Sequence, residues 1–246
     1  MKILIASPSY DGSVRREYMK AVLELTETLR QQGIAWSLLI EPATILHTMR
    51  SVMASQALLD ADCTHLLFID TDLAFSSSTI ERLISANTDV IGCAYPYRTI
   101  PLDQAPASGA ASLRQAISSA VPYALRFRAG IQSVAVNNGL CEVAGIGTGL
   151  LLIRRQALEK LVQSGTVKTY QTGFPYSQWF QAPTYYGFFD HLEVDGVQLG
   201  EDYSFCQRWT HTCGGTITAL VDQEVGHIGP VAILGRYTDR LRAGQL

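Results

Sequence analysis

Two carboxylates stand two residues apart at the end of an apolar run in this sequence. The run is Leu66 to Ile69, and Asp70 and Asp72 follow it in the stretch THLLFIDTDLAF. Side chains at positions i and i+2 of a strand point the same way, so the two carboxylates repel each other unless a cation or hydrogen bonds offset their charge. Hard divalent cations prefer such oxygen ligands. The alternative is structural, with Asp72 capping the following turn and Asp70 binding backbone amides.

A histidine near the end of the sequence adds a third candidate ligand. His227 lies in the segment EVGHIGP, just beyond the last strand that the pattern predicts. Two carboxylates and one imidazole suit Mn²⁺ or Mg²⁺ when phosphate oxygens complete the coordination. A single histidine is more often structural, but in this combination Asp70, Asp72 and His227 are the predicted metal ligands.

The elements that must position these side chains alternate along the first part of the chain. Apolar runs typical of strands are separated by segments with helical periodicity; the strands are 2–7, 35–40, 65–70 and 89–95, and the helices are 13–33, 44–62 and 76–87. Ser13 is the expected N-cap of the first helix. The alternation predicts an α/β fold with a mostly parallel sheet and helices on both faces. Ligands of such sheets bind beyond the carboxyl ends of the strands, where Asp70 and Asp72 fall.

The rest of the chain has a less regular pattern. Strands are expected at 123–128, 141–147 and 216–221, and helices at 154–165 and at the start of 201–215. The stretch 170–190 is rich in aromatic residues and irregular. The Ala/Ser-rich stretch 103–120 is interpreted as a flexible insertion. The whole of 1–246 is predicted to be one domain, with a first half at about 1–100 and a second half at about 121–235.

Composition limits the function classes. The net charge of −3 gives no strong field for nucleic acid or anionic membranes, so non-specific nucleic-acid binding is not expected. Five scattered cysteines without zinc spacing favour reduced thiols. Pro8 breaks the first apolar run too early for a signal peptide, and no apolar run approaches the ~18 residues that a membrane span needs. A cytoplasmic protein without a transmembrane segment is therefore expected.

Five motifs, taken in order, resemble the GT-A glycosyltransferases, specifically the family-2-like bacterial and phage members. The motifs are LLFIDTDLAF, DVIGCAYPYR, GIGTGLLLIRRQALEKL, GEDYSFCQRW and VGHIGP. The resemblance implies a GT-A (Rossmann-like) fold and the transfer of a sugar from a UDP- or GDP-sugar to an acceptor hydroxyl that the sequence does not identify. It also implies that the D-x-D pair and His227 hold Mn²⁺ or Mg²⁺, which binds the diphosphate of the donor.

The resemblance assigns further roles on the catalytic side. Asp202, in the GEDYSFCQRW box, would be the general base that removes the acceptor proton, with Glu201 orienting it, and the reaction would invert the anomeric configuration. The GIGTG loop at 145–149, which contains Gly147, would form a tight backbone wall beside the donor sugar, and Thr148 would hydrogen-bond a hydroxyl. The resemblance makes about 1–100 the nucleotide-binding half and about 121–235 the acceptor and catalytic half, with the aromatic stretch 170–190 shaping the acceptor side. Plain helix N-terminal charge is the alternative for the Glu201-Asp202 pair.

The remaining implied contacts are with the nucleotide. Pro8 and Tyr10 follow the first strand, where relatives contact the nucleotide, and Tyr10 would stack on the base; a plain surface turn is the alternative. Asp70 would face the ribose as well as the metal. Arg50 stands where relatives carry an Arg-Asn pair aimed at the donor, although Ser51 replaces the asparagine here. For Arg50 the alternative is an exposed arginine on a helix surface.

Two other functions stay open at the level of sequence. A nucleotidyltransferase shares the sheet and the metal chemistry, but SPSYDGSVRRE is a poor version of its Gly-rich basic signature. A non-catalytic module that binds a nucleotide or a sugar, derived from a transferase, is the other alternative, and the retained acidic pairs and His227 count against it. Metal-dependent hydrolysis of a nucleotide-sugar would separate the three.

Overall fold

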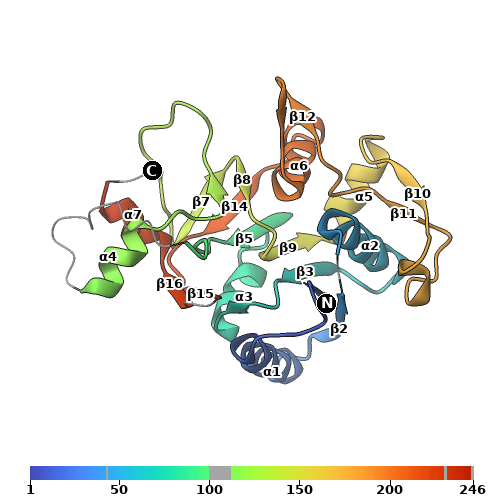
Figure 1. The fold of residues 1–246 in the computed structure, drawn as a ribbon, viewed down its shortest axis with the longest axis horizontal. Helices are drawn as coiled ribbons and strands as arrows, with labels where there is room; N and C mark the ends of the chain where they lie inside the picture. The colour runs from blue at the N-terminus through green and yellow to red at the C-terminus, as the bar shows by residue number, and fades with distance from the viewer. Residues whose placement is uncertain (43, 100–111, 230–231, 245–246) are drawn as a thin grey trace.

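The computed structural model describes residues 1–42, 44–99, 112–229 and 232–244. At its centre lies a seven-stranded sheet in the order β2-β1-β3-β9-β5-β14-β7 (Figure 1). Strands β1, β2, β3, β5 and β14 share one direction, and β9 and β7 run against them. The strands are β1 (Lys2–Ser9), β2 (Ala35–Pro42), β3 (His65–Ile69), β5 (Val90–Cys93), β7 (Leu140–Val143), β9 (Leu150–Arg154) and β14 (Ile217–Leu220).

Helices cover both faces of this sheet. Helix α1 (Arg16–Gln31) contacts α3 (Ser77–Ser85) on one face, and α2 (Leu46–Leu59) contacts α5 (Arg155–Gln163) on the other. The predicted α/β class, with a mostly parallel sheet between two helical layers, is therefore confirmed. None of the helices in the described part of the chain is both long enough and apolar enough to cross a membrane.

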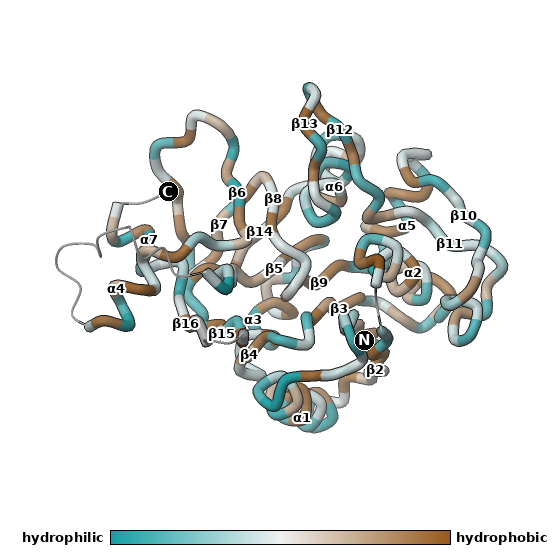
Figure 2. Tube along the Cα trace, in the orientation of Figure 1, coloured by the Kyte–Doolittle hydropathy of each residue, from teal (hydrophilic) through white to brown (hydrophobic). Residues whose placement is uncertain are grey.

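Two separate cores result from the alternation of side chains along the strands. Ile3 and Ile5 of β1 pack with helices α1 and α3, whereas Leu4 and Ala6 pack with helices α2 and α5. The inner strands β3, β9 and β5 are hydrophobic on both faces, which Figure 2 shows as mostly brown segments at the centre of the trace. Strands buried on both faces read as continuous apolar runs, which explains the LLFI pattern before Asp70.

Strand β9 was not among the predicted elements, and it decides the geometry of the site. It lies between β3 and β5 and pairs antiparallel with both. In this register Ile69 stands opposite Leu150, and the Asp70 N–H donates to the Gly149 carbonyl at 2.8 Å. The loop before β9 is therefore held directly against the first aspartate.

A small three-stranded sheet brings the C-terminal part of the chain to the same place. It contains β4 (Leu73–Ala74), β15 (Val225–Ile228) and β16 (Ala232–Gly235) in the order β16-β15-β4. His227 pairs with Leu73 in this sheet, and the Ile228 N–H donates to the Asp72 carbonyl at 2.8 Å. Residues that are far apart in the sequence, His227 and Asp72, thus become neighbours.

Other elements surround these sheets. Helix α6 (Glu201–Gln207) continues into a π-helical turn, η2 (Arg208–Thr212), and packs on β8 (Gly145–Ile146). The short strands and the 3-10 turn around them are β6 (Leu125–Arg126), β10 (Thr169–Gln171), η1 (Tyr176–Gln178), β11 (Thr184–Tyr186), β12 (Glu193–Val194) and β13 (Val197–Gln198).

The predicted flexible insertion at 103–120 falls partly outside the described residues, which resume at residue 112. Ser112 caps helix α4 (Leu113–Ala120), because its hydroxyl accepts a hydrogen bond from the Gln115 N–H at 3.2 Å. Helix α4 packs against β16 and against helix α7 (Tyr237–Arg242). The second part of the stretch is thus a capped helix, where the sequence showed only a weak helical pattern.

The prediction that Ser13 caps the first helix is wrong. Helix α1 begins at Arg16, and its N-cap residue Arg15 makes no side-chain capping bond. The Ser13 N–H and hydroxyl both donate to Oδ1 of Asp11, at 2.9 and 2.6 Å. Ser13 therefore belongs to a tight turn before the helix, because its bonds to Asp11 hold it two residues ahead of the N-cap position Arg15.

Candidate functional site

Asp70 is held by a buried arginine from helix α2. Nη2 of Arg50 donates to Oδ1 of Asp70 at 2.9 Å, and Nε of Arg50 lies 3.7 Å from Oε1 of Glu201. Arg50 is only 2% exposed, so the reading as an exposed helix arginine is wrong. Its Nε and Nη1 have no hydrogen-bond partner among the described residues. Both nitrogens are themselves buried, so the guanidinium acts on the site mainly through its charge and its bond to Asp70.

Packing beneath Arg50 fixes its position. The guanidinium carbon lies 5.5 Å from the centre of the Phe68 ring on β3, at a distance typical of a cation–π contact. The next residue, Ser51, accepts a hydrogen bond from the Phe189 N–H at 3.0 Å. Ser51 therefore anchors a neighbouring loop, and Arg50 alone faces the site.

Asp72 meets His227 and a second arginine. Oδ2 of Asp72 lies 3.3 Å from Nε2 of His227 and 2.9 Å from Nη1 of Arg98. Burial raises the pKa of the Asp72 carboxyl, but the contact with His227 and the charge of Arg98 outweigh it and hold the pKa below its ordinary value. Asp72 is therefore a carboxylate at neutral pH.

The orientation of the His227 ring is set from behind. Its Nδ1 lies 2.8 Å from the carbonyl oxygen of Pro96, and a carbonyl only accepts, so Nδ1 carries a proton. Nε2 is then the ring nitrogen that faces Asp72, at a distance that a proton or a cation between the two groups would bridge. Histidines that bind metals are held in this way, with the far nitrogen donating to a carbonyl or carboxylate.

The three predicted metal ligands are thus arranged as a pair and a separate residue. Asp72 and His227 are in contact, while Asp70 pairs with Arg50. Within the described ranges, no three His, Cys, Asp or Glu side chains are placed to hold one ion. Mg²⁺ and similar ions are commonly held by one or two protein ligands, with phosphate oxygens and waters completing the shell. Asp72 and His227 fit such a site, and the full ligand set stays a prediction.

The second acidic pair opens helix α6. The Thr148 hydroxyl donates to Oδ1 of Asp202 at 3.2 Å. Burial raises the pKa of Asp202 to about 7; the attraction of Arg50 opposes this shift, and the neighbouring charge of Glu201 adds to it. A carboxyl group with a pKa near 7 is suited to accept a proton at neutral pH.

Glycines in the GIGTG loop allow the backbone to approach a buried tyrosine. The Gly149 N–H donates to the hydroxyl of Tyr95 at 3.0 Å. A Cβ at Gly147 would overlap the same hydroxyl, and one at Gly149 would lie 2.9 Å from Oδ2 of Asp70. Because only glycine fits at these two positions, the loop lies against Asp70 as a backbone wall.

Two residues of the site had no predicted role, Tyr95 and Arg98. The ring of Tyr95 meets that of His227 edge-on, with centroids 5.6 Å apart. Both residues follow strand β5 in the DVIGCAYPYR motif, and the carboxyl edge of a central strand is where ligand-binding side chains gather. That position was the signal that could have found them.

The predicted nucleotide contacts Pro8 and Tyr10 lie at the end of β1. Pro8 is buried in the strand and stands opposite Glu41 of β2. Tyr10 is 84% exposed. No hydrogen bond, ion pair or ring contact in the described part of the chain joins Tyr10 to Asp70 or Arg50. Its role at the base stays a prediction.

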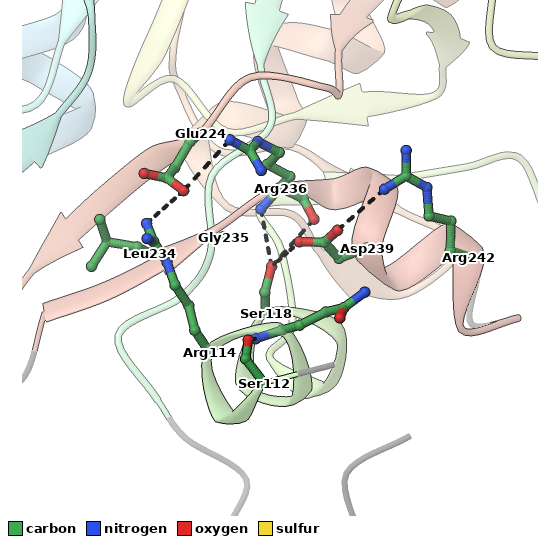
Figure 3. Close-up of a pocket in the computed structure, with 10 residues that line it drawn as sticks. Ser112, Arg114, Ser118, Glu224, Leu234, Gly235, Arg236, Asp239 and Arg242 are labelled. Atoms are coloured by element: carbon green, nitrogen blue, oxygen red, sulfur yellow. Dashed lines mark hydrogen bonds and ion pairs between the residues drawn. The ribbon is translucent and has the colours of Figure 1, made fainter. Parts of the chain in front are cut away.

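A separate cavity of about 340 Å³ lies between helices α4 and α7 and strand β16 (Figure 3). Its charged side chains pair with one another, as Figure 3 shows for Arg114 with Glu224 and for Arg242 with Asp239. Ser118 donates a further bond to Asp239 at 3.0 Å. The pairing leaves the cavity without the unpaired donors found at Arg50.

Comparisons with known proteins bear on the fold. No protein-family model and no curated protein sequence matches the chain. Among solved structures the chain is similar to A197 from STIV, with 18% identity over 96% of this chain and 95% of that chain and a TM-score of 0.51. This likeness shows a shared fold and nothing further.

Two other solved structures are similar at a lower level. One is a glycosyltransferase involved in the glycosylation of the major capsid of PBCV-1, with 18% identity over 72% of each chain and a TM-score of 0.33. The other is the inositol-1-phosphate CTP transferase from T. maritima, with 8% identity over 89% of this chain and 84% of that chain and a TM-score of 0.38. With TM-scores below 0.5, neither carries an argument about this chain.

Proposed function

We propose that this protein is a glycosyltransferase that moves a sugar from a nucleotide-sugar to an acceptor hydroxyl, depends on Mn²⁺ or Mg²⁺, and inverts the anomeric configuration. The observation that carries the proposal is the convergence of three chain segments on one edge of the sheet. After β3, Asp72 contacts His227 of β15. Asp70 pairs with Arg50, which in turn lies near Glu201 at the start of helix α6. A site with a cation-binding edge, a buried guanidinium and a carboxyl of raised pKa contains the groups that such a transfer needs.

Each group has a distinct part in the proposed reaction. Arg50 holds Asp70 with Nη2 and would contribute a buried positive charge beside the oxygens of the donor. Asp72 and His227 would hold the cation, which when bound supplies charge neutralisation for the leaving nucleoside diphosphate. The wall of Gly147 and Gly149 limits where the donor sugar can lie.

Asp202 is the proposed general base. Its carboxylate would take the proton of the acceptor hydroxyl while the hydroxyl oxygen attacks the anomeric carbon. The bond between that carbon and the diphosphate would break on the opposite side of the sugar. Inversion needs such a base, because the leaving group cannot take a proton on the attacking side. The hydrogen bond from Thr148 keeps one carboxylate oxygen in a fixed orientation.

A substrate screen tests this function. Thermal shift of the protein with Mn²⁺ and a panel of UDP-sugars, GDP-sugars and nucleoside triphosphates should show stabilisation by a nucleotide-sugar. Release of the nucleoside diphosphate should then follow, either to an acceptor or slowly to water. Release of pyrophosphate from a triphosphate would instead identify a nucleotidyltransferase, and tight binding without any turnover would identify a binding module.

A single variant tests the role of Asp202 within that reaction. Asp202→Asn keeps the size and the bond from Thr148 but cannot accept the proton. Turnover should fall about 10²–10⁴-fold while nucleotide-sugar affinity stays nearly unchanged. Proton NMR of the product should show the inverted anomer. A retained anomer, or normal turnover of Asp202→Asn, would contradict the mechanism even if the transferase activity itself is found.

A further inference from the structure

Arg98 supplies the positive charge that Asp72 faces in this structure. It follows β5 at the carboxyl edge of the sheet, and its Nη1 lies 2.9 Å from Oδ2 of Asp72. Its side chain is 49% exposed. The other arginine of the site, Arg50, is buried and pairs with Asp70 instead. Arg98 is thus a half-exposed cation beside the proposed cation-binding carboxylate.

The oxygen that Arg98 contacts is shared with the proposed metal site. Oδ2 of Asp72 faces both Nη1 of Arg98 and Nε2 of His227. A divalent cation held between Asp72 and His227 would need this same oxygen, and its charge would repel the guanidinium. Because the Arg98 side chain is half exposed, it can leave Asp72 without disturbing the core. Cation binding and the Arg98–Asp72 ion pair therefore compete.

When a cation displaces Arg98 from Asp72, the guanidinium of Arg98 stays next to the cation. It therefore lies beside the diphosphate that the cation would bind. The planar fork of an arginine matches phosphate oxygens and pairs with them in a bidentate manner. On the basis of the proposed function, we propose that Arg98 binds the diphosphate of the nucleotide-sugar once a cation has replaced it on Asp72. In the cation-free protein, Asp72 holds Arg98 at the site. Cation binding and diphosphate binding are therefore coupled through Oδ2 of Asp72.

This assignment predicts opposite effects of one substitution on two ligands. Calorimetry would measure Mn²⁺ alone, and then UDP and GDP at saturating Mn²⁺, on the wild type, Arg98→Ala and Arg98→Lys. Arg98→Ala should bind Mn²⁺ about two- to fivefold more tightly, because a competing surface ion pair is lost. It should bind the nucleoside diphosphate at least about tenfold more weakly, because charge-assisted bonds to phosphate are lost. Both affinities of Arg98→Lys should lie between those of the wild type and those of Arg98→Ala.

A matched control separates this effect from net charge. Arg128→Ala also removes one exposed arginine, which pairs with Glu142 at 2.7 Å, and it should leave both affinities unchanged. If Arg98→Ala binds the nucleotide as well as or better than the wild type, Arg98 is at most a competitor for Asp72 and the assignment is overturned, while the proposed function stands. If the wild type binds neither UDP nor GDP with Mn²⁺, the proposed function fails and the assignment fails with it.

Discussion

Replacing Asp202 by asparagine should stabilise the fold of the cation-free protein, and increasingly so as the pH rises. Burial raises the pKa of this carboxyl from the model-compound value of 3.8 to about 7, so the folded protein favours the neutral form. In the unfolded chain the same group ionises from about pH 4 upward. Stability contributed by Asp202 is therefore lost as the pH rises from about 4 to 7, and the loss levels off above pH 7. Asparagine imitates the neutral form at every pH.

The size of the effect follows from the two pKa values. A difference of about three units corresponds to at most about 4 kcal/mol above pH 7, at 1.36 kcal/mol per unit. The attraction of Arg50 is already included in that difference, because it opposes the effect of burial. At pH 4.5 the same linkage makes the free energy of unfolding of Asp202→Asn only about 1 kcal/mol higher than that of the wild type. The difference in free energy of unfolding between Asp202→Asn and the wild type should thus widen by about 3 kcal/mol between pH 4.5 and pH 8.

Urea unfolding at pH 4.5, 6 and 8, in buffer with a chelator and without nucleotide, measures this gap. Glu142→Gln is the matched control, because it removes a carboxylate that is 55% exposed and pairs with Arg128. The control should stay within about 0.5 kcal/mol of the wild type at all three pH values. A gap for Asp202→Asn that does not change with pH, or a variant that is less stable than the wild type at pH 8, would refute the reasoning.

Three further predictions concern the donor wall, the core and the thiols. Gly149→Ala should lower the free energy of unfolding by about 1–3 kcal/mol in urea, because the added Cβ would lie 2.7 Å from the Tyr95 ring; an unchanged midpoint would contradict this. Phe68→Ala should cost about 3–5 kcal/mol in the same assay, because Phe68 is fully buried beneath Arg50; a loss below 1 kcal/mol would contradict the packing. Mass spectrometry after alkylation of the native protein should find Cys213 modified first and all five thiols free after unfolding, whereas a disulfide would contradict the reduced state.

Much of the framework could be predicted from the sequence, because the strands that carry the site have clear signals. The apolar run before Asp70 and the alternation of strands and helices are sufficient to place that residue at the carboxyl edge of a sheet. The spacing of EVGHIGP after β14 similarly favoured a place for His227 near this edge. These predictions needed only local patterns and one general rule about α/β sheets.

Other parts of the site depend on tertiary contacts that local patterns do not encode. The run LLLI of β9 follows a Gly-rich loop, and periodicity alone cannot separate a short buried strand from a buried helix segment. Arg50 looks like a surface residue in the sequence, and its burial depends on Phe68 and on Asp70 and Glu201 from other segments. The ion pair of Arg98 with Asp72 likewise exists only once two strand ends meet.

The most direct test of the central claim is the binding of a nucleoside diphosphate with and without a divalent cation. Isothermal calorimetry would titrate UDP and GDP into the wild type and into Asp72→Ala, in Mn²⁺ and in chelator. We predict that the wild type binds one of the two nucleotides with Mn²⁺ and loses that affinity in chelator. Asp72→Ala, which lacks the carboxylate that faces His227, should bind weakly and equally in both conditions. Equal, cation-independent binding by both proteins would contradict the account.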